Sequence, residues 1–283
     1  MIECPGGAID YEETGTGATI VLVPGSCSTG AAWRPVVAHW NGVFRCVTTS
    51  LLGYGRTAER RTENDIGIAL EAEIVESVTA RAGGAVHLVG HSFGGLAALA
   101  VALRNRVPLL SLTIIEAPAP DILRQTGDRW HYAAFREMSD AYIGSFASGD
   151  ESAIARMIDF FGGAGTFATW PERVRRFACQ TTPVNILDWE TAYRFPLSPA
   201  ILALVDVPTL VLCGGASHAA MRCANQRLAE GITGASIVTL PAAAHFMIAT
   251  HPGEVACLIA SHVTGAARAD RDAPATSDWN PGP

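Results

Sequence analysis

The chain has 283 residues, of which 49% are hydrophobic, and a formal net charge of −7. This length supports one large hydrophobic core, with room for an inserted subdomain. Acidic residues outnumber basic ones 27 to 20 and no run of Lys and Arg is present, which argues against a nucleic-acid partner. No apolar run reaches the roughly 18 residues that a membrane span needs, which argues against a membrane partner.

The N-terminal stretch MIECPGGAIDYEETG contains acids and glycines, but neither a basic segment nor an apolar run. It does not look like a signal peptide, and we therefore expect a cytoplasmic protein. The seven cysteines are scattered and show no CxxC spacing. Free thiols are the simplest interpretation, with neither a disulfide framework nor a metal site.

Short apolar runs alternate with longer segments of helical spacing. The N-terminal AIDYEETG alternates in polarity and suits an antiparallel edge strand. The expected strands are residues 19–24, 44–50, 85–90 and 109–118, and the expected helices are residues 31–40, 66–83 and 92–106. This order predicts an α/β fold, with a mostly parallel sheet covered by helices on both faces.

The alternation stops after Pro118. No clear strand is visible in the next 80 or so residues, which are rich in aromatic side chains. We predict a helical cap or lid over residues 119–199, inserted into a core formed by residues 1–118 and 200–264.

The alternation resumes near Val207. Strands are expected at residues 209–213 and 235–241, followed by a last helix at residues 252–263. The remaining residues, 265–283, are small, charged and rich in proline, which predicts a disordered tail.

The pentapeptide GHSFG, residues 90–94, places Ser92 between a predicted strand and a predicted helix. A serine at such a sharp turn adopts a strained backbone conformation that only small neighbours allow. Its hydroxyl then projects above the sheet, at the positive end of the following helix. The sequence therefore predicts Ser92 as a nucleophile. The alternative is a glycine-rich packing turn with an idle serine.

The order of these motifs resembles the α/β-hydrolase family. Besides GHSFGG, the segment VLVPGSCSTGAAW lies where the family carries HG and a small or aromatic residue. LLGYGRT resembles the family's xxGyGxS loop, and AAAHFMIATHPGEV resembles its histidine loop and last helix. The resemblance covers Thr19 to Val263 and implies a serine hydrolase with a helical cap. Pro24 and Ser50 depart from the family's usual His and Asp.

The resemblance also implies an oxyanion hole. One donor is expected to be the backbone N–H of Phe93, and the other that of Ser26, with Cys27 as an alternative. Gly25 would let the backbone approach closely. We expect Gly25 and Cys27 to line the substrate pocket as well, together with His91, Trp130 and Trp189.

His245 is the expected general base, because it follows the last apolar strand and comes after Ser92 in the chain, as the family requires. His251 is the second candidate, but it is expected to lie at the start of the last helix. The other histidines have an ordinary interpretation as surface or packing residues.

The carboxylate that should orient this histidine is missing from its usual place, because the turn after residues 209–213 reads GGAS. Asp206 precedes that strand and should lie at the wrong edge of the sheet. Some family members, including certain dehalogenases and a zearalenone-lactonase-like group, carry the acid after the preceding strand, where Glu116 lies. The resemblance therefore implies Glu116 as the acid. Asp121 and a purely structural Glu116 are the alternatives.

Ser92, His245 and Glu116 with an oxyanion hole predict acyl transfer through an acyl-enzyme. We expect hydrolysis of a small-molecule carboxylic ester or lactone, with no cofactor and no metal. Amide hydrolysis, C–C bond hydrolysis and cofactor-free haloperoxidase activity on the same triad are alternatives, as is a non-catalytic ligand-binding protein. A homodimer is possible.

Overall fold

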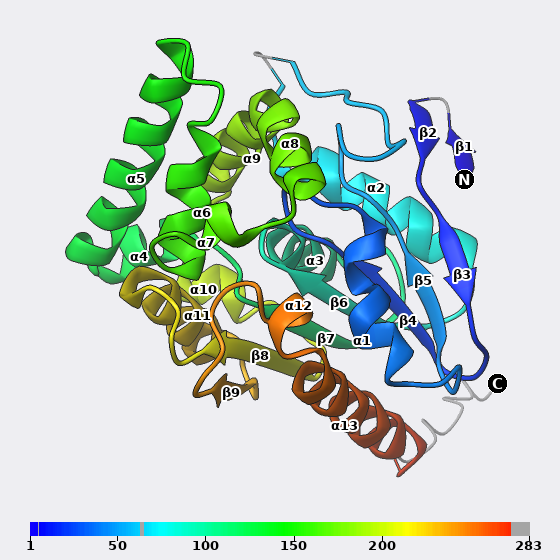
Figure 1. Ribbon diagram of the computed structural model, residues 1–283. Helices are drawn as coiled ribbons and strands as arrows, with labels where there is room; N and C mark the ends of the chain where they lie inside the picture. The colour runs from blue at the N-terminus through cyan, green and yellow to red at the C-terminus, as the bar shows by residue number, and fades with distance from the viewer. Residues whose placement is uncertain (5, 63–64, 273–283) are drawn as a thin grey trace, which may run out of the picture.

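The structure, a computed structural model, describes residues 1–4, 6–62 and 65–272 (Figure 1). The strands are β1 (Ile2–Cys4), β2 (Gly7–Ile9), β3 (Glu12–Thr14), β4 (Thr19–Val23), β5 (Arg45–Thr48), β6 (Val86–His91), β7 (Leu109–Ile115), β8 (Thr209–Gly214) and β9 (Ser236–Leu240). The helices are η1 (Gly30–Trp33), α1 (Arg34–Ala38), α2 (Ile68–Ala82), α3 (Phe93–Arg104), α4 (Pro120–Thr126), α5 (Arg129–Ala147), α6 (Ile154–Gly162), α7 (Thr166–Thr169), α8 (Glu172–Gln180), α9 (Thr182–Arg194), α10 (Pro199–Leu202), α11 (Ala219–Gly231), α12 (Met247–Thr250) and α13 (Pro252–Asp272).

The central sheet has the strand order β3-β5-β4-β6-β7-β8-β9. Strand β3 pairs antiparallel with β5, and the other neighbours in this sheet pair in parallel. Strands β1 and β2 form a separate antiparallel pair. The mostly parallel sheet with an antiparallel edge strand is therefore confirmed.

Successive residues of β4 point to opposite faces of the sheet. Ile20 and Leu22 belong to the buried cluster that η1, α1 and α13 cover, whereas Val21 and Val23 belong to the cluster on the side of α2, α3 and α11. A strand that is buried on both faces must be apolar throughout, which explains the unbroken sequence TIVLV. Helices on both faces are thus confirmed too.

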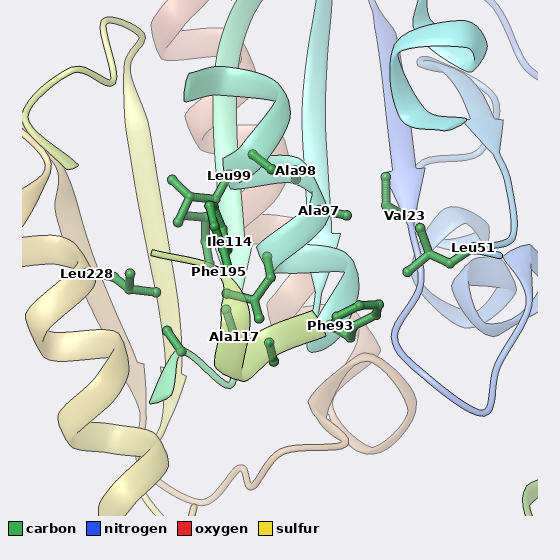
Figure 2. Close-up of a cluster of buried hydrophobic side chains, with 14 of the residues drawn as sticks. Val23, Leu51, Phe93, Ala97, Ala98, Leu99, Ile114, Ala117, Phe195 and Leu228 are labelled. Carbon is green, nitrogen blue, oxygen red and sulfur yellow. The ribbon is translucent and has the colours of Figure 1, made fainter. Parts of the chain in front are cut away.

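Helix α3, which follows Ser92, lies deep in the first of these layers. Figure 2 shows Ala97, Ala98 and Leu99 of this helix in the buried cluster that also contains Ile114 of β7. Small alanine side chains let the helix approach the sheet closely, and close packing limits its movement. The first turn of α3 is therefore a rigid support for the residue before it.

The segment between β7 and β8 contains helices α4 to α10 and, in the described residues, no strand. Figure 1 shows α5 to α9, in green, gathered on one side of the molecule, away from β3 and α13. We call residues 119–199 the helical insertion. It contributes its own large buried side chains, such as Phe135 and Tyr142, to the main core cluster.

Helix α13 extends further than the sequence predicts. It continues through Asp272, eight residues past the expected end of the core at residue 264, and Ala266 is buried on it. The structure thus has helix at residues 265–272, where the sequence predicts a disordered tail, because alanine and arginine readily prolong a helix that is already packed. Residues 273–283 lie outside the described residues.

Within the described ranges, no helix is both long and apolar enough to cross a membrane.

Candidate active site

Three loops at one edge of the sheet bring together side chains that are far apart in the chain. The register pairs His91 with Ile115, and Gly214 of β8 with Leu240 of β9. The carboxyl ends of β6, β7, β8 and β9 therefore meet at the same edge, which is where ligands bind in open parallel sheets. Ser92 follows β6 and Glu116 follows β7. His245 lies in the loop between β9 and α12.

The imidazole of His245 lies between the other two side chains. Its Nε2 is 2.9 Å from Oγ of Ser92, and its Nδ1 is 3.4 Å from Oε2 of Glu116. In the tautomer that suits this arrangement, Nδ1–H faces the carboxylate and Nε2 accepts the serine hydroxyl. The structure thus brings together the three residues that the sequence predicts as nucleophile, base and acid.

Ser92 and Glu116 both have backbone conformations that are unusual for residues with side chains. Their φ angles are +55° and +52°. Such angles cost free energy and persist only where surrounding contacts hold them. The backbone N–H of Ser92 donates to Ile115 (2.8 Å), and that of Glu116 donates to Leu212 (3.0 Å). Neighbouring strands therefore hold both turns in place.

Glu116 is fully buried, and its second carboxylate oxygen accepts a 2.6 Å hydrogen bond from the backbone N–H of Gly214. Burial opposes ionisation, but His245 and this N–H outweigh it and lower the pKa of Glu116. A Cβ at position 214 would lie 2.4 Å from the carbonyl oxygen of Ala243. The space around position 214, at the end of β8, therefore does not admit a side chain. At this position the strand contributes a backbone N–H donor to Glu116 instead.

The alternative acid, Asp121, is engaged elsewhere. Its Oδ2 accepts the backbone N–H of Leu197 (2.9 Å), and its other oxygen pairs with Arg124. Both contacts join parts of the helical insertion, and neither involves His245. Asp206 is exposed just before β8. The geometry therefore favours Glu116 over both other carboxylates.

The predicted oxyanion donors adjoin Ser92. A Cβ on Gly25 would lie 2.7 Å from Cβ of Ser92, so only glycine allows the loop after β4 to approach this closely. Among the described residues, the amides of Ser26 and Phe93 donate to no acceptor in a loop or turn. Phe93 is the first residue of α3, where N–H groups lack intrahelical partners. Both amides are available to a substrate oxygen.

His91 holds the loop that carries the base. Its Nε2 is 2.8 Å from the carbonyl oxygen of His245, to which the ring N–H donates. Burial lowers the pKa of His91 to about 3, so the ring stays neutral at physiological pH. His91 also borders the cavity described below.

A cavity of about 640 Å³ adjoins Ser92 and His245. Gly25, Cys27 and Trp189 line it, as the sequence predicts. Its walls also include apolar side chains from the helical insertion, among them Met157, Ile158, Phe161, Val174 and Phe177. The ring of Phe161 stacks on His245 with a centroid distance of 4.4 Å.

Trp130 is not part of this cavity. Its side chain is 89% exposed, on the first turn of α5. The structure contradicts the expectation that Trp130 lines the pocket, because an abundance of aromatic residues predicts a packed helical segment but not which face of each helix a residue occupies.

The described residues contain no group of three or more His, Cys, Asp or Glu side chains arranged as metal ligands would be. In the part of the chain that the structure describes, six cysteines are free thiols. Cys27, with a φ of +53°, is the one next to Ser26.

A buried polar cluster beside the cavity joins the predicted residue Ser26 to side chains that the sequence analysis did not place in the site. Asp188 of α9 contacts Ser26, Tyr54 and Arg61. Tyr54 lies in the LLGYGRT motif, but Asp188 is 162 residues from Ser26 in the chain, and no local pattern indicates that contact.

A profile described as the alpha/beta hydrolase family matches residues 20–256. The chain belongs to this family. Among proteins of similar sequence, a pimeloyl–acyl-carrier-protein methyl ester esterase of Aliivibrio salmonicida is 34% identical over 110 residues. The matched part covers 38% of this chain and 40% of that relative.

Solved structures of hydrolases superpose on most of this chain. A thermophilic esterase from Thermogutta terrifontis has a TM-score of 0.73 at 22% identity, with 91% of this chain and 93% of that chain covered. Est816, described as an N-acyl homoserine lactone degrading enzyme, also has a TM-score of 0.73, at 19% identity, covering 92% and 98% of the two chains. At these identities the likeness shows the fold.

Proposed function

We propose that this hydrolase cleaves carboxylic esters or lactones through an acyl-enzyme on Ser92. The observation that carries the proposal is the position of the His245 ring, 2.9 Å from the Ser92 hydroxyl and 3.4 Å from the Glu116 carboxylate, beside a largely apolar cavity. A serine with a base and an orienting acid is the arrangement that acyl transfer requires.

The reaction follows from these positions. Oγ of Ser92 attacks the carbonyl carbon of the substrate while its proton passes to Nε2 of His245. Glu116 remains ionised and stabilises the imidazolium that forms. The substrate oxygen becomes negatively charged and accepts hydrogen bonds from the amides of Ser26 and Phe93, each worth about 3 kcal/mol in such sites.

His245 then gives the proton to the leaving alkoxide, and the alcohol departs. Water attacks the acyl-enzyme in the second half of the reaction, again with His245 as the base. In a lactone the alcohol stays attached to the acyl group, so both halves yield one hydroxy acid. The cavity wall of Met157, Ile158 and Trp189 supports an apolar acyl or alcohol part.

Proteins of similar sequence or structure support the same chemistry. They include an esterase in the sequence comparison, and an esterase and a lactone-degrading enzyme among the superposed structures. The presence of Ser92 and His245 together argues against a non-catalytic ligand-binding protein.

The test compares the wild type with Ser92→Ala on p-nitrophenyl acetate, longer p-nitrophenyl esters and a simple lactone. We expect turnover by the wild type and none by the variant. A serine-directed phosphonate should add to Ser92, as peptide mass spectrometry would show. If the wild type neither hydrolyses these compounds nor forms the adduct, the protein is a ligand-binding member of the family instead.

A further inference from the structure

Asp188 connects the helical insertion to the loop that carries an oxyanion donor. Its Oδ2 accepts hydrogen bonds from the hydroxyls of Ser26 (2.5 Å) and Tyr54 (2.6 Å), and its Oδ1 accepts one from Nη1 of Arg61 (2.6 Å). The Asp188 side chain is 2% exposed and that of Arg61 is fully buried. Short charge-assisted contacts of this kind, shielded from water, are the strong class of hydrogen bonds.

The three groups around Asp188 are all donors. Burial raises the pKa of Asp188, while Arg61 and the hydroxyls of Ser26 and Tyr54 favour the ionised form. Arg61 can only donate, so its guanidinium, 2.6 Å from Oδ1, pairs with the ionised carboxylate. The ionised carboxylate can only accept, and it therefore fixes the direction of the Ser26 hydroxyl, which donates to it.

Arg61 anchors this carboxylate to the segment after β5. Its guanidinium also contacts Glu59 (2.7 Å) and Glu71 (3.3 Å), and it donates to the carbonyl oxygen of Leu52. The buried guanidinium of Arg61 therefore fixes the position of Asp188. Ser26, in contrast, lies in the loop after β4, where its hydroxyl donates to Asp188 and the next residue, Cys27, has a positive φ.

We propose that Asp188 is a positioning residue for the oxyanion hole, acting through the hydroxyl of Ser26. The inference rests on the proposed function, because it concerns the backbone N–H that Ser26 contributes to it. A hydrogen bond from the Ser26 side chain restricts the rotation of that residue and thereby the direction of its N–H. A donor of this type stabilises the transition state only if it points at the developing oxyanion.

The same helix contributes to the substrate cavity. Asn185, Trp189 and Ala192 of α9 line it, together with Asp188. Substrate that packs against α9 therefore contacts the element that aligns Ser26. Helix α9 of the helical insertion thus contacts both the substrate cavity and the loop that carries Ser26.

Four variants test the inference: Ser26→Ala, Ser26→Thr, Asp188→Asn and the double variant Ser26→Ala/Asp188→Asn. Ser26→Ala keeps the backbone N–H and loses only the tether, so we expect kcat to fall about 10-fold, with KM changed less than about 3-fold. Ser26→Thr keeps a hydroxyl and should retain most of the activity. Asp188→Asn should resemble Ser26→Ala.

The double variant is the decisive comparison. If both residues act through one hydrogen bond, the double variant should be no slower than the slower single variant, whereas independent effects would multiply. The rate at which the phosphonate modifies Ser92 should fall in parallel with kcat, because its phosphoryl oxygen occupies the oxyanion hole.

Asp121→Asn is the matched control, since Asp121 is a buried aspartate of the helical insertion with an arginine partner and a backbone donor, but without contact to the oxyanion loop. It should lower the melting temperature and leave kcat unchanged. If Asp188→Asn does not fold, the contrast between Ser26→Ala and Ser26→Thr decides the question.

Unchanged kcat in both Ser26→Ala and Asp188→Asn, with an active wild type, would overturn this inference alone. A rise in KM at constant kcat would overturn it as well and would make Asp188 a substrate contact. A wild type without turnover and without the Ser92 adduct would overturn the proposed function and this inference with it.

Discussion

The carboxylate of Glu116 faces the imidazole of His245 across 129 residues of sequence, with Oε2 3.4 Å from Nδ1. The contact is possible because β7 and β8 are neighbours and β9 follows at the edge of the sheet. Glu116 therefore approaches His245 from one strand earlier than the position after β8. At that position the backbone of Gly214 faces the acid instead.

Glu116→Gln should lower kcat on the order of 10³ to 10⁴-fold, the loss seen when a triad acid becomes an amide. Gln cannot stabilise the imidazolium and can favour the wrong tautomer of His245. Steady-state kinetics on a p-nitrophenyl ester would measure the loss. Full activity of Glu116→Gln combined with inactivity of Asp121→Asn would transfer the role to Asp121.

Gly25→Ala should lower kcat by roughly 10²-fold, because displacement of reacting groups by about 1 Å can cost that much. The added methyl group would lie 2.7 Å from Cβ of Ser92, so either the serine or the oxyanion loop must move. Circular dichroism should show a folded protein. Gly42→Ala is a suitable control, since a Cβ there meets nothing within 4 Å, although its φ of +81° will cost some stability. Wild-type kcat in Gly25→Ala would contradict the close approach.

Phe161→Leu should reduce kcat/KM about 2- to 10-fold, the equivalent of the 0.5–1.5 kcal/mol that an aromatic pair contributes beyond its area. The ring of Phe161 stacks on His245 and lines the cavity, so its loss affects both the base and the substrate. Phe135→Leu, buried in the same aromatic group without contact to His245, should lower stability only. Equal kinetic effects of the two changes would argue against a specific role of Phe161.

Glu71→Gln should change how stability depends on pH. Burial raises the pKa of Glu71 to about 8, with Arg61 opposing the rise and Asp188 and Glu59 adding to it. An unfolded Glu titrates near pH ~4.3. Between these two values the folded state holds a proton that the unfolded chain releases, so this contribution to stability is complete at low pH and is lost as pH rises toward about 8.

The variant has no such proton. Its free energy of unfolding relative to the wild type should therefore increase by at least about 1.4 kcal/mol, the equivalent of one pKa unit, as pH is raised from about 5 to about 9. Urea denaturation at both pH values would measure this. Glu73→Gln, a more exposed position on the same helix, is the control. The same trend in both variants would show that Glu71 is not its source.

Much of the fold was predictable from short patterns. Apolar strands separated by helical spacing indicated the parallel sheet, and GHSFG between a strand and a helix indicated the turn at Ser92. These signals are local, because a buried strand must be apolar and a sharp turn must have small neighbours. The resemblance to the α/β-hydrolase family extended the prediction to His245 and Glu116.

The cavity wall and the Asp188 contacts were decided by tertiary structure. Trp130 and Trp189 both lie in the aromatic-rich insertion, yet one is exposed and the other lines the cavity. Asp188 meets Ser26 because α9 packs beside the loop after β4, and Arg61 makes a buried carboxylate tolerable there. By itself, the sequence determined which residues could react and in which strand-to-helix turns they lie. The packing of the helices decided which helix face borders the cavity and which distant acid contacts Ser26. Such contacts join segments that are far apart in the chain, so no local periodicity in the sequence indicates them.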